Sequence, residues 1–269
     1  MVRQGNSITI TGQPPAVEPV TDVTGSVRLA SVSKVFGRGG SAVRALDQIS
    51  LDVPPGEFAC LIGASGCGKS TLLNLVAGLE EPTSGEVSVS GRVALMFQEP
   101  ALFPWLTAAG NVELALRAQG LGRTERRQRT TELLDAVRLG GFGGKRPHEL
   151  SGGMRQRVAL ARALAQDADV LLMDEPFGAL DAMTRDLLHE ELERICGERE
   201  LTVLFVTHNV REAARLGDRV IVLSSRPGRV IEEIPVDVKR PRRMDSPEIA
   251  ELGAHMTDRL REEMASHGR

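Results

Sequence analysis

The chain has 269 residues, of which 41% are hydrophobic and 26% are charged, and its formal net charge is −3. This size fits one large domain, or one domain with a subdomain, and the charge argues against a broad basic surface for nucleic acid. No apolar run approaches the ~20 residues that span a bilayer, and the N-terminus has no apolar core of the signal-peptide type. We therefore expect a soluble chain that reaches a membrane only through a partner.

The first part of the chain predicts an extension followed by three strands. Residues 1–26 are rich in Pro, Thr, Val and Gly, which indicates a flexible N-terminal extension. Alternating apolar residues predict a strand over 26–36 and a second over 43–53, and a turn then leads into a short buried strand over 58–62. Phe36, at the end of the first strand, is either a core side chain, as Phe commonly is, or a platform on which adenine stacks.

Directly after the third strand comes a stretch that fits G-x-x-x-x-G-K-[ST], the phosphate-binding loop of nucleoside triphosphatases. Its residues are Gly63, Ala64, Ser65, Gly66, Cys67, Gly68, Lys69, Ser70 and Thr71. Glycines let successive N–H groups face one anion, Lys69 brings a cation to the β- and γ-phosphates, and Ser70 offers a hydroxyl to Mg²⁺. A predicted helix over 69–77, ending at Gly78, places the loop at a helix N-terminus, where the dipole favours phosphate.

The three cysteines indicate a reducing compartment, because Cys60 and Cys67 fall close together on the predicted strand and loop and Cys196 is far away in sequence. Cys67 lies inside the phosphate loop, two residues before Lys69. Loop amides and a neighbouring cation activate a thiol, so we expect Cys67 to react with bulky reagents and to be protected by bound nucleotide.

Two short strands follow, over 85–90 and 93–97, and Gln98 comes at the carboxyl end of the second. Ligands bind beyond the carboxyl ends of strands in open α/β sheets, so Gln98 is well placed for the site, although a single Gln is weak evidence.

Residues 99–148 contain no strand pattern, and we interpret them as a helical insertion in an α/β core. Helices are predicted over 111–119 and 124–137, with Thr124 as N-cap of the second. Trp105 is the only tryptophan. Burial within the insertion and exposure as an anchor for a partner protein are equally open for it.

The next helix begins at an L-S-G-G motif and is expected to run to about residue 166. Ser151 is its N-cap, and Gly152 and Gly153 expose the first backbone N–H groups, which makes a second anion site at a helix N-terminus. A plain serine cap is the alternative, and a chain that already holds one phosphate loop favours the anion site.

An apolar strand over 170–174 ends in two acids, Asp174 and Glu175. The two-residue period places them on opposite faces, so one can hold Mg²⁺ together with Ser70 while the other activates water. Two ionised acids at the end of a buried strand are costly without a cation, which makes a plain surface acid pair the weaker interpretation.

The remaining chain continues the α/β alternation. A tight loop ends at Asp181, a helix is predicted over 182–196 and a strand over 202–206, and His208 follows that strand. His208 is placed either to sense the γ-phosphate or for a structural role, with equal weight. A strand–turn–strand over 219–238 and a last helix after Ser246-Pro247 complete the pattern.

Together these motifs resemble the ATP-binding subunit of an ABC transporter over about residues 27–240. The elements in family order are the phosphate loop, the Q-loop glutamine Gln98, the signature Leu150-Ser151-Gly152-Gly153, the Asp174-Glu175 strand end, the D-loop residue Asp181 and the switch histidine His208. The signature continues with Met154 where Gln is commoner, Phe36 replaces the usual Tyr, and Asn209 replaces Asp.

The resemblance implies an α/β P-loop NTPase cassette, a RecA-like core with an antiparallel β portion and a helical subdomain. The core would comprise residues 27–98 and 162–240, the subdomain with the signature 99–161, and a C-terminal helix 241–269. ATP and Mg²⁺ would be bound, with Phe36, the phosphate loop and Asp181 at the nucleotide and Ser70, Gln98 and Asp174 near the metal.

The resemblance also implies catalytic roles and partners. Glu175 would be the general base or the group that orients the water, and Lys69, Gln98 and His208 would be further catalytic residues. Two copies of the chain would sandwich two ATP molecules, with Ser151, Gly152 and Gly153 of one copy capping the nucleotide of the other.

Three segments look like the nitrate, sulfonate and taurine importer branch of the family, namely 97–107, 173–181 and 224–229. This implies a peripheral protein on the cytoplasmic face of a bacterial cell membrane that hydrolyses ATP to drive uptake of a small anion. Its partners would be permease subunits and, indirectly, a solute-binding protein, with no nucleic acid. The alternative is a soluble ABC-type ATPase acting on nucleic acid or the ribosome; a P-loop kinase leaves the L-S-G-G motif unexplained.

Overall fold

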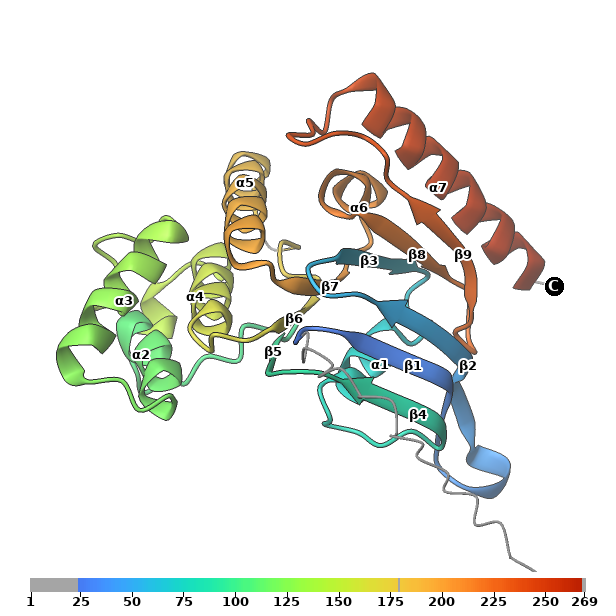
Figure 1. The fold of residues 1–269 in the computed structure, drawn as a ribbon, viewed down its shortest axis with the longest axis horizontal. Coiled ribbons are helices and arrows are strands. Elements are labelled where there is room, and N and C mark those ends of the chain that lie inside the picture. Colours follow the sequence, from blue (N-terminus) through green and yellow to red (C-terminus); the bar gives the residue numbers. More distant parts are fainter. Residues whose placement is uncertain (1–23, 179, 268–269) are drawn as a thin grey trace, which may run out of the picture.

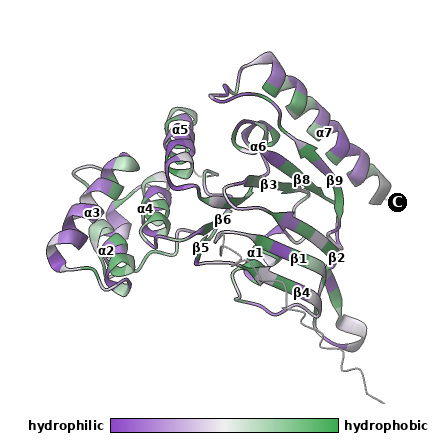
Figure 2. Ribbon diagram, viewed as in Figure 1, coloured by the Kyte–Doolittle hydropathy of each residue, from purple (hydrophilic) through white to green (hydrophobic). Residues whose placement is uncertain are grey.

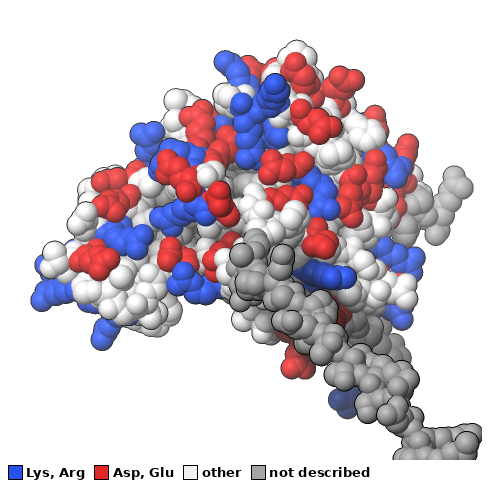
Figure 3. Space-filling model, viewed as in Figure 1, with Lys and Arg blue, Asp and Glu red and all other residues white. Residues whose placement is uncertain are grey.

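The computed structural model describes residues 24–178 and 180–267 (Figure 1). The predicted flexible extension, 1–26, falls outside the described residues except for its last three. In the described ranges, no helix is long and apolar enough to cross a bilayer. Lys and Arg alternate with Asp and Glu on the face drawn in Figure 3 rather than gathering into one basic area.

The centre of the molecule is a six-stranded sheet in the order β5-β6-β7-β3-β8-β9. The first five strands are parallel and β9 runs antiparallel to β8. The strands are β3 (Phe58–Gly63), β5 (Val93–Met96), β6 (Val170–Asp174), β7 (Thr202–Val206), β8 (Arg219–Leu223) and β9 (Val230–Pro235). Every residue of β3 and β7 is buried, which explains their unbroken apolar sequences, because both faces of the sheet are covered.

A second, antiparallel sheet has the order β2-β1-β4 and lies across one face of the central sheet (Figure 1). Its strands are β1 (Val27–Phe36), β2 (Val43–Val53) and β4 (Ser84–Val89). Helix α1 (Lys69–Val76) packs in one apolar cluster with both sheets, while alternate residues of the same central strands enter a second cluster on the other face. The predicted α/β class with an antiparallel portion is confirmed.

Three helices, α2 (Ala108–Ala118), α3 (Arg123–Ala136) and α4 (Gly152–Leu164), lie together beside the β5 end of the central sheet (Figure 1). Described residues 99–148 contain no strand, as predicted. The predicted start of α2 is wrong by three residues, because Thr107 caps the helix and its hydroxyl accepts from the Gly110 N–H at 3.0 Å.

The predicted capping role of Thr124 is also wrong. Helix α3 begins at Arg123, so Thr124 already lies within the first turn, and the N-cap position is Gly122, without a side-chain cap.

The other helices are α5 (Ala182–Arg199), α6 (Val210–Leu216) and α7 (Pro247–His267), and two short 3₁₀ helices span Gly39–Ser41 and Pro147–Glu149. Figure 2 shows the strands largely hydrophobic and the outer helices mixed. The sequence did not predict α6, since seven residues are too few for a periodic pattern; Asn209 defines its start by accepting from the N–H groups of Arg211 and Glu212. In α5, Leu188 and Leu192 are buried, whereas Leu187 is 42% exposed.

Candidate active site

The phosphate-loop sequence connects β3 to α1 in the predicted way. Gly68 has φ +107°, and a Cβ there would lie 2.6 Å from Leu46 Cδ2, so the loop requires glycine at this position. The Lys69 ammonium is turned into the loop and donates to the carbonyls of Gly63 at 2.9 Å and Ala64 at 3.0 Å. The loop therefore holds its own cation in place.

The loop forms one wall of a cavity of about 470 Å³. It is lined by Phe36, Val43, Ala45, Ser65, Gly66, Gly68, Lys69, Ser70, Thr71, Gln98, Glu175 and Arg226. A larger cavity, about 990 Å³, contains none of the residues predicted for the site, so volume alone does not identify the active site.

Phe36 is 39% exposed in the cavity wall, so the interpretation as a core side chain is wrong. The ammonium of Lys34, two residues earlier on the same strand, lies 4.9 Å from the ring centroid in a cation–π contact. An exposed, positioned aromatic ring at the rim of this cavity is suited to stacking on a flat base.

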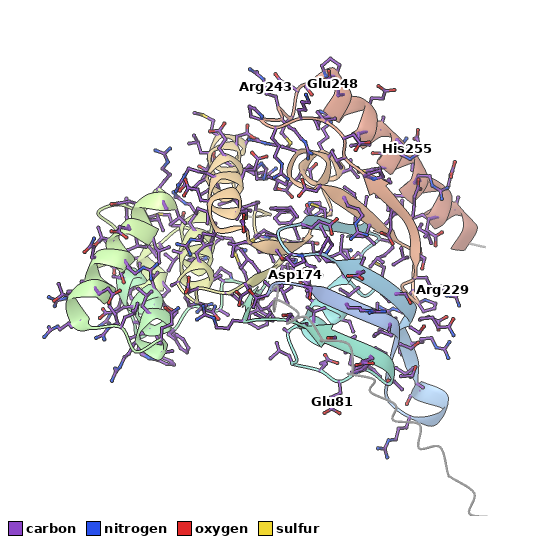
Figure 4. The ribbon with its side chains drawn as sticks, in the orientation of Figure 1. Glu81, Asp174, Arg229, Arg243, Glu248 and His255 are labelled. Carbon is purple, nitrogen blue, oxygen red and sulfur yellow. The ribbon has the colours of Figure 1, made fainter. Side chains whose placement is uncertain are left out.

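Asp174 ends β6 beside the phosphate loop and accepts a hydrogen bond from the Ser70 hydroxyl. Figure 4 labels it near the centre of the molecule. Burial raises the pKa of Asp174 above its usual range and the charge of Glu175 raises it further, while the Ser70 hydrogen bond and Lys69 act in the opposite direction.

Glu175 follows β6, and its carboxylate contacts side chains that follow the two neighbouring strands, β5 and β7. Its Oε2 lies 3.4 Å from Gln98 Nε2, beyond β5, and 3.2 Å from His208 Nδ1, beyond β7. The backbone of Glu175 has φ +46°, a conformation that costs a non-glycine residue about 1–3 kcal/mol. The Gln98 carbonyl in turn accepts from Gln156 Nε2 at 3.2 Å, which links this group to α4.

The residues around Ser70 fit Mg²⁺ in kind. A hydroxyl and a carboxylate already meet there, and Gln98 offers an amide oxygen in the same cavity; oxygen ligands are the ones Mg²⁺ prefers. Within the described ranges, no group of three or more His, Cys, Asp and Glu could hold a metal ion. Mg²⁺ commonly keeps waters and substrate phosphates as its remaining ligands.

Nine predicted residues do not line this cavity. Five of them belong to the phosphate loop or contact Ser70 or Glu175, namely Gly63, Ala64, Cys67, Asp174 and His208, and the other four are Ser151, Gly152, Gly153 and Asp181. Ser151 caps α4 as predicted, its hydroxyl accepting from the Met154 N–H at 3.2 Å, and it is exposed. Asp181 caps α5 and is also exposed; the hydrogen bond from the Thr184 N–H lowers the pKa of Asp181.

The prediction of a reactive Cys67 is wrong for this conformation. The side chain is 1% exposed, and its Sγ lies 2.8 Å from where a Cβ on Gly63 would be. The thiol points into the protein behind the loop, where a bulky reagent cannot reach it.

Sequence reasoning missed two polar residues here, Gln156 and Arg226. Arg226 follows β8, which pairs in parallel with β3, and the carboxyl ends of parallel neighbours meet at one edge. The position of Arg226 soon after β8 was the sequence signal that could have placed it at the phosphate loop.

One prediction concerns Asp174. A raised pKa means that the folded state binds the proton more tightly than the unfolded chain, so above that pKa the ionised group destabilises the fold. We expect Asp174→Asn to raise the melting temperature of the nucleotide-free protein at pH 7.5 by a few degrees, and the gain to shrink as the pH falls toward that pKa. The same variant should lose most of the stabilisation given by MgATP. An unchanged or lower melting temperature without nucleotide contradicts the prediction.

The fold and this cavity define a P-loop nucleotide-binding cassette, and comparison with known proteins agrees. The family model described as "ABC transporter" matches residues 46–178. The taurine import ATP-binding protein TauB of Rhizobium johnstonii is 47% identical over 76% of this chain and 80% of its own length. The nitrate import ATP-binding protein NrtD of Synechocystis is 47% identical over 79% of this chain and 83% of its own.

A solved structure shares the fold. The dimeric ATP-binding cassette MJ0796, in a post-hydrolysis state bound to ADP and phosphate, has a TM-score of 0.74 and 35% identity, covering 79% of this chain and all of that one. The chain thus belongs to the ABC transporter ATP-binding family, whose cassettes bind ATP and act as ATPases.

Proposed function

We propose that this chain is the ATP-hydrolysing subunit of an importer for a small anion of the nitrate, sulfonate or taurine type. The observation that carries the proposal is that Glu175, which lines the cavity with Lys69 and Ser70, contacts both Gln98 and His208. Its relatives at 47% identity, named for taurine and nitrate import, support the class of transported solute.

In the proposed mechanism, the loop amides and Lys69 bind the phosphates while Phe36 stacks on adenine. Glu175 orients the attacking water and accepts its proton. An ionised carboxylate only accepts hydrogen bonds, so His208 Nδ1 carries the proton in its contact with Glu175 Oε2. With Gln98 and His208 both on Oε2, Oε1 is left for the water. Mg²⁺, bound by Ser70, Asp174 and Gln98, would neutralise charge on the phosphates.

We also propose the division of labour along the chain. Residues 27–98 and 162–240 form the nucleotide-binding core, 99–161 the helical subdomain with the signature, and 241–269 a C-terminal helical part. A second copy would supply Ser151, Gly152 and Gly153, with Asp181 near the shared nucleotide. The dimeric cassette that shares this fold supports a pair of copies.

The proposed setting is the cytoplasmic face of a bacterial cell membrane, where the chain binds permease subunits peripherally and serves a solute-binding protein indirectly. No observation favours the alternative of a soluble ATPase on nucleic acid or the ribosome. Charges of both signs are mixed on the face in Figure 3, and the net charge is −3.

Trp105 provides the test of the permease partnership. It is 68% exposed, and its ring lies 5.4 Å from that of Phe103, whose N–H donates to Asn111 Oδ1 at 2.8 Å. A large aromatic side chain held in place yet exposed is typical of an interface anchor. We expect Trp105→Ala to reduce co-purification with the permease about tenfold or more, which corresponds to ~1.4 kcal/mol, and to leave basal ATPase activity within about twofold.

Phe142→Ala is the matched control, since Phe142 is also an exposed aromatic residue, at 43%, in a different loop. It should co-purify like the wild type. A wild-type chain that retains no permease contradicts the proposed function, while equal retention by Trp105→Ala removes only Trp105 from the interface.

A further inference from the structure

The segment Ser224–Arg229, here called the arginine loop, has no role in the proposed function, yet it touches the phosphate loop. It follows β8, which pairs in parallel with β3. Arg226 Nε donates to the Gly66 carbonyl at 3.2 Å, across 160 residues of sequence, and the Arg226 side chain lines the same cavity as Lys69.

The arginine loop is held in shape by its own hydrogen bonds. The Ser224 hydroxyl donates to the Pro227 carbonyl at 2.9 Å and accepts from the Arg229 N–H at 2.9 Å. The Ser225 N–H donates to Glu263 of α7 at 3.1 Å. Arg226 therefore projects from a braced turn rather than from a mobile one.

Gly228 fixes the arginine loop against the back of the phosphate loop. Its N–H donates to the Ala45 carbonyl and its carbonyl accepts from the Asp47 N–H, both at 2.9 Å. A Cβ on Gly228 would lie 2.2 Å from the Cys67 carbonyl oxygen, so the two loops approach as closely as backbone allows. The position of Arg226 relative to the phosphate loop is thus set by direct backbone contact.

The guanidinium of Arg226 has hydrogen-bond donors that contact no acceptor in the described residues. Within residues 24–178 and 180–267 its one hydrogen bond is the one from Nε to Gly66, which leaves both terminal nitrogens without a protein acceptor. A guanidinium presents paired donors that match phosphate oxygens, whereas the Lys69 ammonium is already shared between two loop carbonyls. Phe36 marks the base end of the cavity, and Arg226 joins the wall at the phosphate loop itself.

We propose that Arg226 is a further binding residue of the nucleotide site: its Nε holds the Gly66 carbonyl of the phosphate loop, and its terminal nitrogens bind phosphate oxygens of a nucleoside di- or triphosphate. This inference rests on the proposed nucleotide site and adds a second cation to it. In this arrangement Gly228 of the arginine loop packs against the phosphate loop, and the Arg226 guanidinium adds positive charge to the wall of the cavity.

The test measures binding of fluorescent mant-ATP and mant-ADP to the full chain in the presence of Mg²⁺. Arg226→Gln should weaken both affinities about tenfold, the effect of losing one charge-assisted hydrogen bond. Arg226→Lys, which keeps the charge but loses the paired donors, should recover part of the loss. The melting temperature without nucleotide should stay close to that of the wild type, since Arg226 is exposed.

Arg229→Gln is the matched control. Arg229 belongs to the same loop, but its guanidinium contacts Asp47, it does not line the cavity, and Figure 4 places it at the outer edge of the molecule. Its loss should change neither affinity by more than about twofold. Lys69→Ala tests the underlying site and should abolish binding.

The outcomes separate the two ideas. Equal affinities of Arg226→Gln and Arg229→Gln, with Lys69→Ala inactive in binding, overturn the role of Arg226 and leave the proposed site standing. Undiminished binding by Lys69→Ala overturns the site itself. A loss by Arg226→Gln that Arg226→Lys does not reduce at all overturns the charge contribution.

Discussion

Glu175→Gln is expected to slow ATP hydrolysis by a factor of about 100 to 10,000, the range for loss of a general base, while ATP affinity stays within about threefold. The substitution keeps the size and hydrogen-bonding shape of the side chain. A glutamine amide cannot take a proton from water, and Gln98 and His208 would still find an oxygen on residue 175 to contact. Binding depends on the phosphate loop and should persist.

Single-turnover hydrolysis and equilibrium binding of ATP, measured on the same preparation, check this prediction. Glu99→Gln is the control, because Glu99 is an exposed acid next to Gln98 in sequence and does not line the cavity. It should retain at least half of the wild-type rate. If Glu175→Gln also retains half of that rate, Glu175 is not the general base. The alternative is then that His208 holds and activates the attacking water.

The elements that sequence predicted best are those in which one short stretch contains its own explanation. The β3–loop–α1 unit is of this kind: an apolar run, a glycine pattern and a helix whose last turn closes on Gly78, with the Leu79 N–H donating to the Asn74 carbonyl at 2.9 Å. The acid pair after β6 was visible for the same reason, because a buried strand ending in two carboxylates is unusual within a few residues.

Features that depend on distant contacts could not be predicted. Cys67 lies against Gly228 of the arginine loop, and Arg226 meets Gly66 across 160 residues. The exposure of Phe36 depends on what covers the end of β1, which its alternating pattern does not reveal. Spacing along the chain carries no information about such packing, so the exposed state of Phe36 and Trp105 required the structure.

The helix that begins after Ser151 could bind a phosphate either of its own chain's nucleotide or of a second copy's nucleotide. Ser151 caps α4 through the Met154 N–H, it is exposed, and it does not line the cavity of its own chain. Free N–H groups at the start of a helix attract an anion, and the phosphate loop of the same chain already has its own helix N-terminus and cation. The γ-phosphate of a nucleotide bound to a second copy could accept hydrogen bonds from the N–H groups at the start of α4. Neither the phosphate loop nor α4 would then have to move within its own chain.

Glu175→Gln therefore should become dimeric on gel filtration with MgATP, because the uncleaved γ-phosphate stays between the two chains, and remain monomeric with MgADP. Adding Ser151→Arg places a bulky side chain where that phosphate would dock. If capping occurs between chains, the double variant binds ATP with the affinity of Glu175→Gln but stays monomeric. Thr124→Arg is the control, since Thr124 lies in the first turn of a different helix, α3, and it should leave dimerisation intact.

Two other results of that experiment would decide against capping between chains. A fall in ATP affinity of the Glu175→Gln, Ser151→Arg protein by tenfold or more, ~1.4 kcal/mol, would place Ser151 at the nucleotide of its own chain, in conflict with its absence from that cavity wall. Undiminished ATP-driven dimerisation would leave Ser151 as a helix cap alone, since its hydroxyl bond to the Met154 N–H would then be its whole contribution. The γ-phosphate is the only difference between ATP and ADP, so the two nucleotides separate docking on that phosphate from any general effect of filling the site.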